Sequence, residues 1–224
     1  MRALLLSRHA GLLLGGMAIA MLLGMIHGWR HRDSAPSSTE GPPWVYGRAA
    51  ARFTLVEYAD LECPYCRQYF PVLERWIDAH PEVNWQWQHL PLAMHEPAAT
   101  SEARLAECTG MIEGNAAFWN ALTWIYTHTQ GDGRGVPDSE TYPGLSPNVR
   151  QCLAGERPDA TIRAQVADAK ESGVAATPTA RLLDHQSGKA LVLPGPVDGD
   201  ALLSAIDLLA NGAAMTAPTS APSR

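Results

Sequence analysis

A run of strand-forming residues that leads directly into Cys-Pro-Tyr-Cys constrains the fold of this chain more than any other stretch. The run at residues 53–58 is short and largely apolar, which is typical of a buried strand. Pro64 suits the first position of a helix, and apolar residues recur at helical spacing from there to about His80. The pattern predicts a strand, a turn and a helix, with Cys63 at the helix N-terminus and Cys66 on the same helix face.

The order of the later segments predicts a mixed α/β domain that is interrupted by helices. Residues 83–90 alternate well enough to form a second strand, and the β-α-β order implies parallel pairing through a right-handed crossover. Helical patterns follow at residues 96–111, 116–128 and 158–172. Two short strands at 179–183 and 190–193 and a helix at 198–209 then complete the domain. We therefore expect two sheet-forming parts on either side of a helical insertion at about residues 96–172.

The N-terminal segment, residues 1–33, has the charged, apolar and polar order of an export signal. Its apolar run from Ala10 to Ile26 is long for a signal-peptide core and just reaches the length of a membrane-spanning helix. No good cleavage site follows the run. We expect an uncleaved anchor that holds residues 10–28 in the inner membrane, with the rest of the chain in the periplasm or otherwise outside the cytoplasm. A cleaved signal peptide is the alternative.

The segments that flank the predicted domain have the composition of connecting chain. Residues 34–47 are rich in Pro, Ser and Gly and are predicted to be a linker, whereas residues 211–224 are predicted to be a disordered tail. The folded domain would then occupy residues 48–210. Hydrophobic residues make up 46% of the chain, which is enough for one core, and a net charge of −6 argues against binding to nucleic acid.

The two closely spaced cysteines admit three roles: half of a zinc site, a structural clip or a redox pair. A zinc ribbon needs a second pair of ligands, but the other cysteines, Cys108 and Cys152, stand singly. A disulfide between Cys63 and Cys66 closes too short a loop to stabilise the fold by much. A cysteine at a helix N-terminus is favoured as a thiolate. We therefore predict a redox pair that needs neither metal nor organic cofactor, in which Cys63 is the exposed nucleophile and Cys66 resolves mixed disulfides.

Taken together, these features resemble the thioredoxin superfamily, and specifically its DsbA-like branch, in which a helical domain is inserted into the thioredoxin fold. The resemblance covers about residues 50–210. It rests on Val-Glu-Tyr-Ala-Asp-Leu-Glu-Cys-Pro-Tyr-Cys, the β-α-β beginning, the inserted helices and Gly-Val-Ala-Ala-Thr-Pro-Thr at 173–179. It implies a thioredoxin fold and a thiol:disulfide oxidoreductase.

The resemblance also implies roles for residues around the cysteine pair. Pro178 matches a cis proline that lies against the active-site disulfide and helps to bind the substrate backbone, with Thr177 before it. Pro64 and Tyr65, between the cysteines, would also face the substrate. Glu57 matches a buried acidic residue beneath the disulfide that transfers a proton to the second cysteine; the alternative is a water-facing glutamate on an edge strand.

The expected function is therefore that of a monomeric dithiol oxidase that acts on reduced or unfolded exported proteins and passes its electrons to a redox partner in the membrane. A disulfide reductase or isomerase is the second enzymatic interpretation. A non-catalytic chaperone or interaction module on the same fold is a third interpretation, although such a module has no need of a dithiol.

The two remaining cysteines are expected to form a second disulfide. Outside the cytoplasm an even number of cysteines favours pairing, and keeping Cys63 with Cys66 leaves Cys108 with Cys152. Closing this loop would stabilise the fold by roughly 4 kcal/mol in a chain-entropy model. Two buried reduced thiols are the alternative.

Residues next to the pair are expected to set its redox strength. Asp60 and Glu62 would raise the Cys63 pKa if their charges lie close to it. Strong oxidases of the DsbA branch carry histidine where this chain has Tyr65, so we expect an oxidase of moderate strength. His95 could line the rim of the site or be an ordinary surface histidine.

Overall fold

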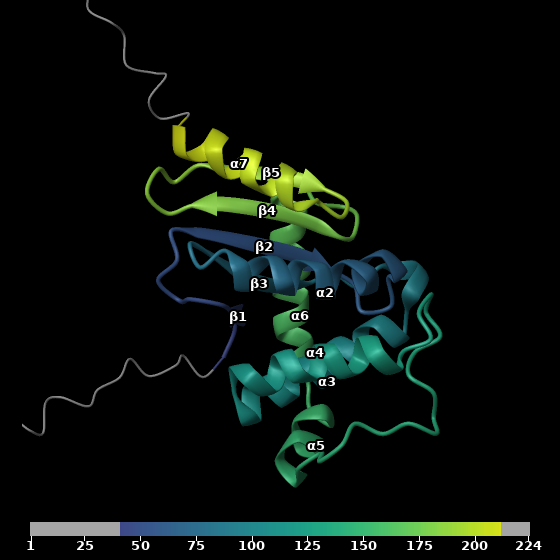
Figure 1. Cartoon of the computed structure of the whole chain (residues 1–224). Coiled ribbons are helices and arrows are strands. Elements are labelled where there is room, and N and C mark those ends of the chain that lie inside the picture. Colours follow the sequence, from purple (N-terminus) through teal and green to yellow (C-terminus); the bar gives the residue numbers. More distant parts are fainter. Residues whose placement is uncertain (1–40, 212–224) are drawn as a thin grey trace, which may run out of the picture. The chain divides into compact units, whose positions relative to one another are not determined.

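The structure is a computed structural model, and it describes residues 41–211 (Figure 1). The predicted anchor at residues 1–33, the first part of the linker and residues 212–224 of the predicted tail lie outside the described residues. Within the described part, no helix has both the length and the apolar character needed to cross a membrane.

A five-stranded mixed sheet with the order β1-β3-β2-β4-β5 forms the centre of the fold. The strands are β1 (Val45–Tyr46), β2 (Phe53–Ala59), β3 (Val83–His89), β4 (Thr179–Asp184) and β5 (Ala190–Pro194). Strand β2 pairs parallel with β3 and antiparallel with β4, so it is the central strand. All its residues are buried, which explains why its sequence is nearly continuously apolar.

The helices cover the sheet and form the insertion. They are α2 (Pro64–Ala79), the short 3₁₀ helix η1 (Ala93–His95), α3 (Ala98–Glu113), α4 (Asn115–His128), α5 (Pro147–Leu153), α6 (Arg157–Glu171) and α7 (Gly199–Asn211). Helix α2 makes the crossover between the parallel strands β2 and β3. Figure 1 shows α3, α4 and α5 grouped on one side of the sheet, with α6 running from them behind the strands in this view. The predicted strands and the longer helices all occur, with ends shifted by up to two residues.

An aromatic cluster joins the sheet to the insertion. Phe70 of α2, Trp85 and Trp87 of β3, and Trp119 and Tyr126 of α4 have ring centroids 4.6–6.4 Å apart in tilted and edge-to-face pairs. Such pairs add about 0.5–1.5 kcal/mol each beyond the burial of their area. The cluster therefore packs α4 firmly against the strand and helix that carry the cysteines.

The end of the predicted linker belongs to the fold, so the predicted boundary at residue 47 is wrong. Trp44 exposes only 1% of its surface and stacks on Phe118 with ring centroids 5.0 Å apart. Its indole N–H donates to a carboxylate oxygen of Glu107 at 2.9 Å. The next two residues form β1 and pair with β3. The segment rich in Pro, Ser and Gly therefore contains one large residue, Trp44, whose burial attaches the segment to the domain.

We expect Trp44→Ala to lower the free energy of unfolding by about 3–5 kcal/mol, since it removes a buried aromatic side chain and one hydrogen bond of Glu107. Chemical denaturation measures the change. Arg48→Ala, in the exposed segment just beyond β1, is the matched control and should change stability by less than about 0.5 kcal/mol. Equal effects of the two substitutions would contradict the assignment of Trp44 to the folded domain.

Candidate active site

The fold places Cys63 at the start of α2, directly after the central strand. Strand β2 ends at Ala59, and Cys63 is the N-cap of the helix with Pro64 in its first turn. The backbone N–H of Cys63 donates to the carbonyl oxygen of Asp60 at 3.1 Å, which closes the turn between strand and helix. The thiol therefore lies where the free N–H groups and the positive end of the helix dipole favour negative charge.

The two thiols differ strongly in acidity. A hydrogen bond with the Cys66 thiol, helped by the backbone N–H groups of Cys66 and Tyr65 and by Thr177, lowers the pKa of Cys63 to about 6 against the opposing effect of burial. Burial raises the pKa of Cys66 well above its ordinary value, and the hydrogen bond with Cys63 and the charge of Glu57 act in the same direction. Near neutral pH the pair therefore holds a thiolate at Cys63 and a thiol at Cys66.

Cys63 is less accessible than the sequence predicts. Its exposed fraction is 4%, and that of Cys66 is 0%. The expectation of an exposed Cys63 is wrong in degree, although the order of burial is as expected. The cause is the loop that carries Thr177, whose carbonyl oxygen lies 3.6 Å from Cys63 Sγ.

The Thr-Pro segment meets the cysteine pair from the other end of the domain. The peptide bond between Thr177 and Pro178 is cis, as the resemblance implies. Pro178 is buried, and its carbonyl oxygen accepts a hydrogen bond from the N–H of Gly195 at 2.9 Å. Because β4 begins directly after Pro178 and pairs with β2, Thr177 reaches Cys63 across 114 residues of sequence.

A cleft opens beside the two residues that separate the cysteines. The Tyr65 side chain is 64% exposed, and Pro64 is partly exposed. The cleft has a volume of about 330 Å³ and is lined by Tyr65, Gln68, Tyr69, Val72, Pro196, Val197 and Asp198. The start of α2 and the segment before α7 therefore form a surface that an extended chain can contact next to Cys63.

Glu57 lies on the central strand and is completely buried, so the alternative of a water-facing glutamate on an edge strand is wrong. Burial raises its pKa to about 8, and the charge of Cys63 adds to the rise. The nearby indole N–H of Trp85 opposes the rise but makes no hydrogen bond of normal geometry with either carboxyl oxygen. Glu57 can therefore gain or lose a proton near neutral pH, close to the thiol of Cys66.

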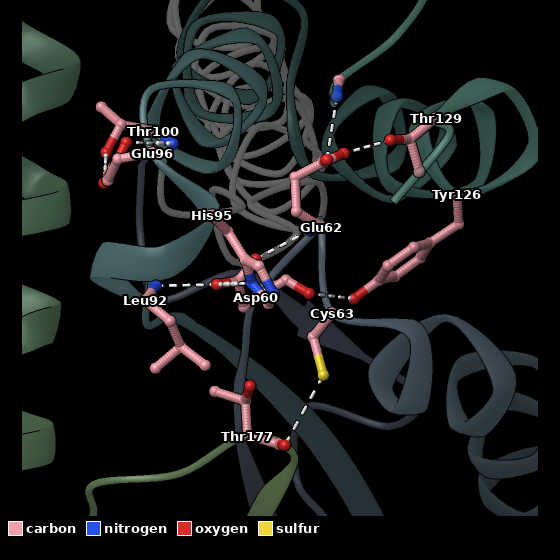
Figure 2. Close-up of polar contacts among 11 residues, drawn as sticks. Asp60, Glu62, Cys63, Leu92, His95, Glu96, Thr100, Tyr126, Thr129 and Thr177 are labelled. Atoms are coloured by element: carbon pink, nitrogen blue, oxygen red, sulfur yellow. Dashed lines mark hydrogen bonds and ion pairs between the residues drawn. The ribbon is translucent and has the colours of Figure 1, made fainter. Parts of the chain in front are cut away.

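Asp60 and Glu62 are buried and are held by residues that follow β3, which differs from the expectation of charges beside Cys63. Figure 2 shows the Glu62 carboxylate turned toward Thr129, whereas Cys63 Sγ points to Thr177. Neither acid is among the groups that shift the Cys63 pKa. Their positions depend on donors more than 30 residues away, which no local pattern reveals.

His95 is neither a surface histidine nor a residue of the rim. Its exposed fraction is 6%, and its Nδ1 lies 2.8 Å from a carboxylate oxygen of Asp60 (Figure 2). The sequence offers one signal that could have suggested this contact: an acidic residue directly after a buried strand needs a partner if the turn is buried too.

The second cysteine pair is bonded. Cys108 of α3 and Cys152 of α5 form a disulfide with Cα atoms 5.7 Å apart, as the even number of cysteines predicts. The bond lies wholly within the insertion. In the part of the chain that the structure describes, no three His, Cys, Asp or Glu side chains gather as a metal site would require.

We expect iodoacetamide to modify Cys63 at least about tenfold faster than Cys66 near neutral pH, because only the thiolate attacks and the pKa values differ in that direction. Peptide mapping after brief labelling of reduced protein measures the ratio. Cys108 and Cys152, which are bonded to each other, provide the internal control if reduction is mild. Equal labelling of the redox pair would contradict the assigned acidities.

Glu57→Gln should stabilise the protein at alkaline pH. The folded state raises the pKa of Glu57 from 4.5 to about 8, so the native state holds a proton that the unfolded chain releases between these values. This glutamate therefore reduces stability progressively as the pH rises through that window. We expect the substitution to raise the free energy of unfolding by about 2–4 kcal/mol above the window and to have little effect below it.

Denaturation curves across this pH range test the expectation. Glu171→Gln, at the exposed end of α6, is the matched control and should show no pH-dependent difference from the unaltered protein. A constant difference at every pH would show that Glu57 is not the group that titrates.

Comparison with known proteins connects this geometry to a family. The family model described as Thioredoxin matches residues 38–207. DsbA2 of Pseudomonas aeruginosa is 44% identical over 75% of this chain and 93% of its own, with a TM-score of 0.71. A thioredoxin-like oxidoreductase of Silicibacter pomeroyi is 23% identical over 80% of this chain and 95% of its own, with a TM-score of 0.57. BdbD of Bacillus subtilis is 20% identical over 75% of this chain and 96% of its own, with a TM-score of 0.56. The last two similarities show the fold.

Curated relatives match over a shorter length. The Na⁺/H⁺ antiporter NhaA 1 of Salinispora arenicola is 33% identical over 138 residues, which are 60% of this chain and 21% of that protein. The chain thus spans about a fifth of the length of the first curated relatives that it matches. The family model, by contrast, covers the strands, the insertion and the cysteine pair. The chain therefore belongs to the thioredoxin family, and within it to the DsbA-like thiol:disulfide oxidoreductases.

Proposed function

We propose that this protein is a dithiol oxidase of moderate strength that introduces disulfide bonds into exported proteins. The observation that carries the proposal is the stabilised thiolate of Cys63, whose pKa is lowered to about 6. Thiolate stabilisation favours the reduced form of the pair, which makes its disulfide a better oxidant of other thiols.

The reaction begins with the Cys63–Cys66 disulfide and a reduced client. A client thiolate attacks Cys63 Sγ, the bond between the two active-site sulfurs breaks, and Cys66 leaves with the electron pair. A second client thiolate then attacks the client sulfur of the mixed disulfide, and Cys63 leaves as the stabilised thiolate. The client gains a disulfide, and the active-site pair gains two electrons. In the opposite direction, Cys66 is the thiol that resolves the mixed disulfide.

Glu57 supplies the proton that Cys66 needs when it leaves. The high pKa of Cys66 means that its thiolate cannot persist in its buried position, and the raised pKa of Glu57 keeps a proton available nearby. Proton transfer between two groups is most effective when the pKa of the donor lies near the working pH. Glu57 then regains its proton before the next cycle.

The client backbone lies along the Thr177–Pro178 segment. This segment lies against the cysteine pair, with the Thr177 carbonyl oxygen 3.6 Å from Cys63 Sγ. The cleft beside Tyr65 receives client side chains on the other side of the sulfur. Such a surface accepts many sequences, because its contacts are mainly to backbone and to one exposed ring.

Export and membrane attachment are part of the proposal. The order of charges and apolar residues in residues 1–33 supports export, and the length of the apolar run supports an anchor at residues 10–28. The Cys108–Cys152 disulfide suits an oxidising compartment. There the protein acts as a monomer, and a redox partner in the membrane removes the electrons it collects.

Two other functions would use the same fold. A reductase or isomerase runs the exchange in the other direction and is distinguished from an oxidase by its potential. A chaperone or interaction module has no use for two thiols of such different acidity, so the acidity difference favours catalysis.

Equilibration with glutathione tests the direction of electron flow. We expect a reduction potential between those of thioredoxin, about −270 mV, and a strong DsbA, about −120 mV. Tyr65→His should make the disulfide more oxidising, because an imidazolium beside Cys63 further stabilises its thiolate. Gln68→His, one turn further along the exposed face of α2, is the matched control and should leave the potential unchanged. A potential as low as that of thioredoxin would identify a reductase instead.

A further inference from the structure

The turn between β2 and α2 contains two acidic side chains that are almost fully buried. Asp60 and Glu62 expose 1% and 0% of their surfaces, and Cys63 follows at once. Burying a carboxylate is unfavourable unless hydrogen bonds replace its water. Both acids have such partners: the Glu62 carboxylate binds the helical insertion, and the Asp60 carboxylate binds the segment just before it.

Every polar atom of Glu62 is engaged. Its carboxylate accepts hydrogen bonds from the Thr129 hydroxyl and from the backbone N–H of Gly135, the latter at 2.9 Å. Its backbone carbonyl accepts from the N–H of Asp132 at 2.8 Å, and its own N–H donates to Asp60 at 2.7 Å. Figure 2 shows the carboxylate reaching from the turn to the end of α4.

Thr129, the C-cap of α4, makes hydrogen bonds on both sides of the turn between β2 and α2 (residues 60–63), which we call the redox turn. Its hydroxyl donates to Glu62, which precedes Cys63, and its carbonyl oxygen accepts from the Arg67 guanidinium of α2 at 3.0 Å. Its N–H is bonded to Ile125 within α4, which fixes its own position. One residue of the insertion is therefore hydrogen-bonded both to the residue just before Cys63 and to the residue just after Cys66.

Asp60 completes this attachment on the opposite side of the turn. Its carboxylate accepts from the N–H of Leu92 at 2.7 Å and lies 2.8 Å from His95 Nδ1. The Tyr126 hydroxyl donates to its backbone carbonyl at 3.3 Å. Three residues that follow β3 thus fix the turn, and none of these bonds involves a sulfur atom.

A second carboxyl group, that of Glu102, is close enough to Glu62 for Glu62 to shift its pKa. Glu102 of α3 is buried, and burial together with the charge of Glu62 raises the Glu102 pKa to about 9, although neither Glu102 carboxyl oxygen makes a hydrogen bond of normal geometry. Near neutral pH Glu102 is therefore protonated, and it is the Glu62 side chain that accepts from Thr129 and Gly135.

We propose that Glu62 is a positioning residue of the redox centre. Through its hydrogen bonds with Thr129 and with the Gly135 N–H, the helical insertion holds the Cys63 sulfur at the N-terminus of α2. The thiolate is stabilised only where its sulfur faces the free N–H groups of the helix, an effect confined to the first turn. The insertion therefore affects the pKa of Cys63 indirectly, because its hydrogen bonds are with Glu62 and not with the Cys63 sulfur.

The proposal makes a prediction about sign. Replacing Glu62 by Gln removes an anion, and a direct effect of that anion on Cys63 would lower the pKa of the thiol on its removal. Loss of positioning acts in the opposite direction. A glutamine can accept only one of the two hydrogen bonds and presents an N–H₂ group to the other donor, so the turn relaxes and the pKa of Cys63 rises.

The experiment measures the Cys63 pKa by thiolate absorbance and the glutathione equilibrium constant in Glu62→Gln, Thr129→Val and Thr129→Ser. We expect the first two to raise the pKa by about 0.5–1 unit and to shift the equilibrium constant about threefold to tenfold toward a weaker oxidant. Thr129→Ser keeps the hydroxyl and should retain the values of the unaltered protein. Circular dichroism confirms that each variant is folded.

Glu107→Gln is the matched control. Glu107 is equally buried and also joins the insertion to the rest of the fold, through Trp44 and Gln165, but it does not bind the redox turn. It should leave both redox values unchanged. A lowered or unchanged pKa in folded Glu62→Gln, or a shift of the same size in Glu107→Gln, would overturn the proposal.

These outcomes are independent of the proposed direction of electron flow. Each variant is compared with the unaltered protein, so the positioning role can hold whether the protein is an oxidase or a reductase. The absolute potential tests the proposed function, whereas the differences between variants test Glu62.

Discussion

The meeting of a buried central strand with the N-terminus of a helix is the constraint on which the rest of this structure depends. Strand β2 must be apolar on both faces because strands flank it and helices cover it. The strand ends at Ala59, and a short turn then places Cys63 at the N-terminus of α2. The same burial that stabilises the strand raises the pKa of Glu57 and of Cys66. Packing and acid–base chemistry thus have one cause.

The sequence reveals those parts of the fold that local periodicity controls. The strand at residues 53–58, the helix that begins at Pro64 and the Thr-Pro segment before β4 all lie where the pattern predicts them. The predicted roles of Cys63 and Cys66 rest on helix geometry, and the Cys108–Cys152 bond follows from parity. What the pattern misses is long-range pairing of polar groups: the partners of Trp44 and Glu62 lie more than 60 residues away. Composition assigned Trp44 to a linker, because a single buried ring does not change the average of its surroundings.

The helical insertion has two relationships to the thioredoxin sheet. One is apolar, through the aromatic cluster that packs α4 on α2 and β3. The other is polar, through the acids of the redox turn and the donors at the end of α4. Apolar packing tolerates small shifts, whereas hydrogen bonds fix direction. The insertion is thus attached by one kind of contact and aligned by the other.

The disulfide of the insertion has to survive in a molecule whose chemistry is the opening and closing of disulfides. Exchange at Cys108 is blocked sterically, because that residue has no exposed surface. Attack on the more accessible Cys152 would expel Cys108 as a thiolate into an apolar interior, where burial disfavours the charge. A neighbouring copy with a reactive Cys63 therefore finds no favourable leaving group in this bond. The enzyme is protected against becoming its own substrate.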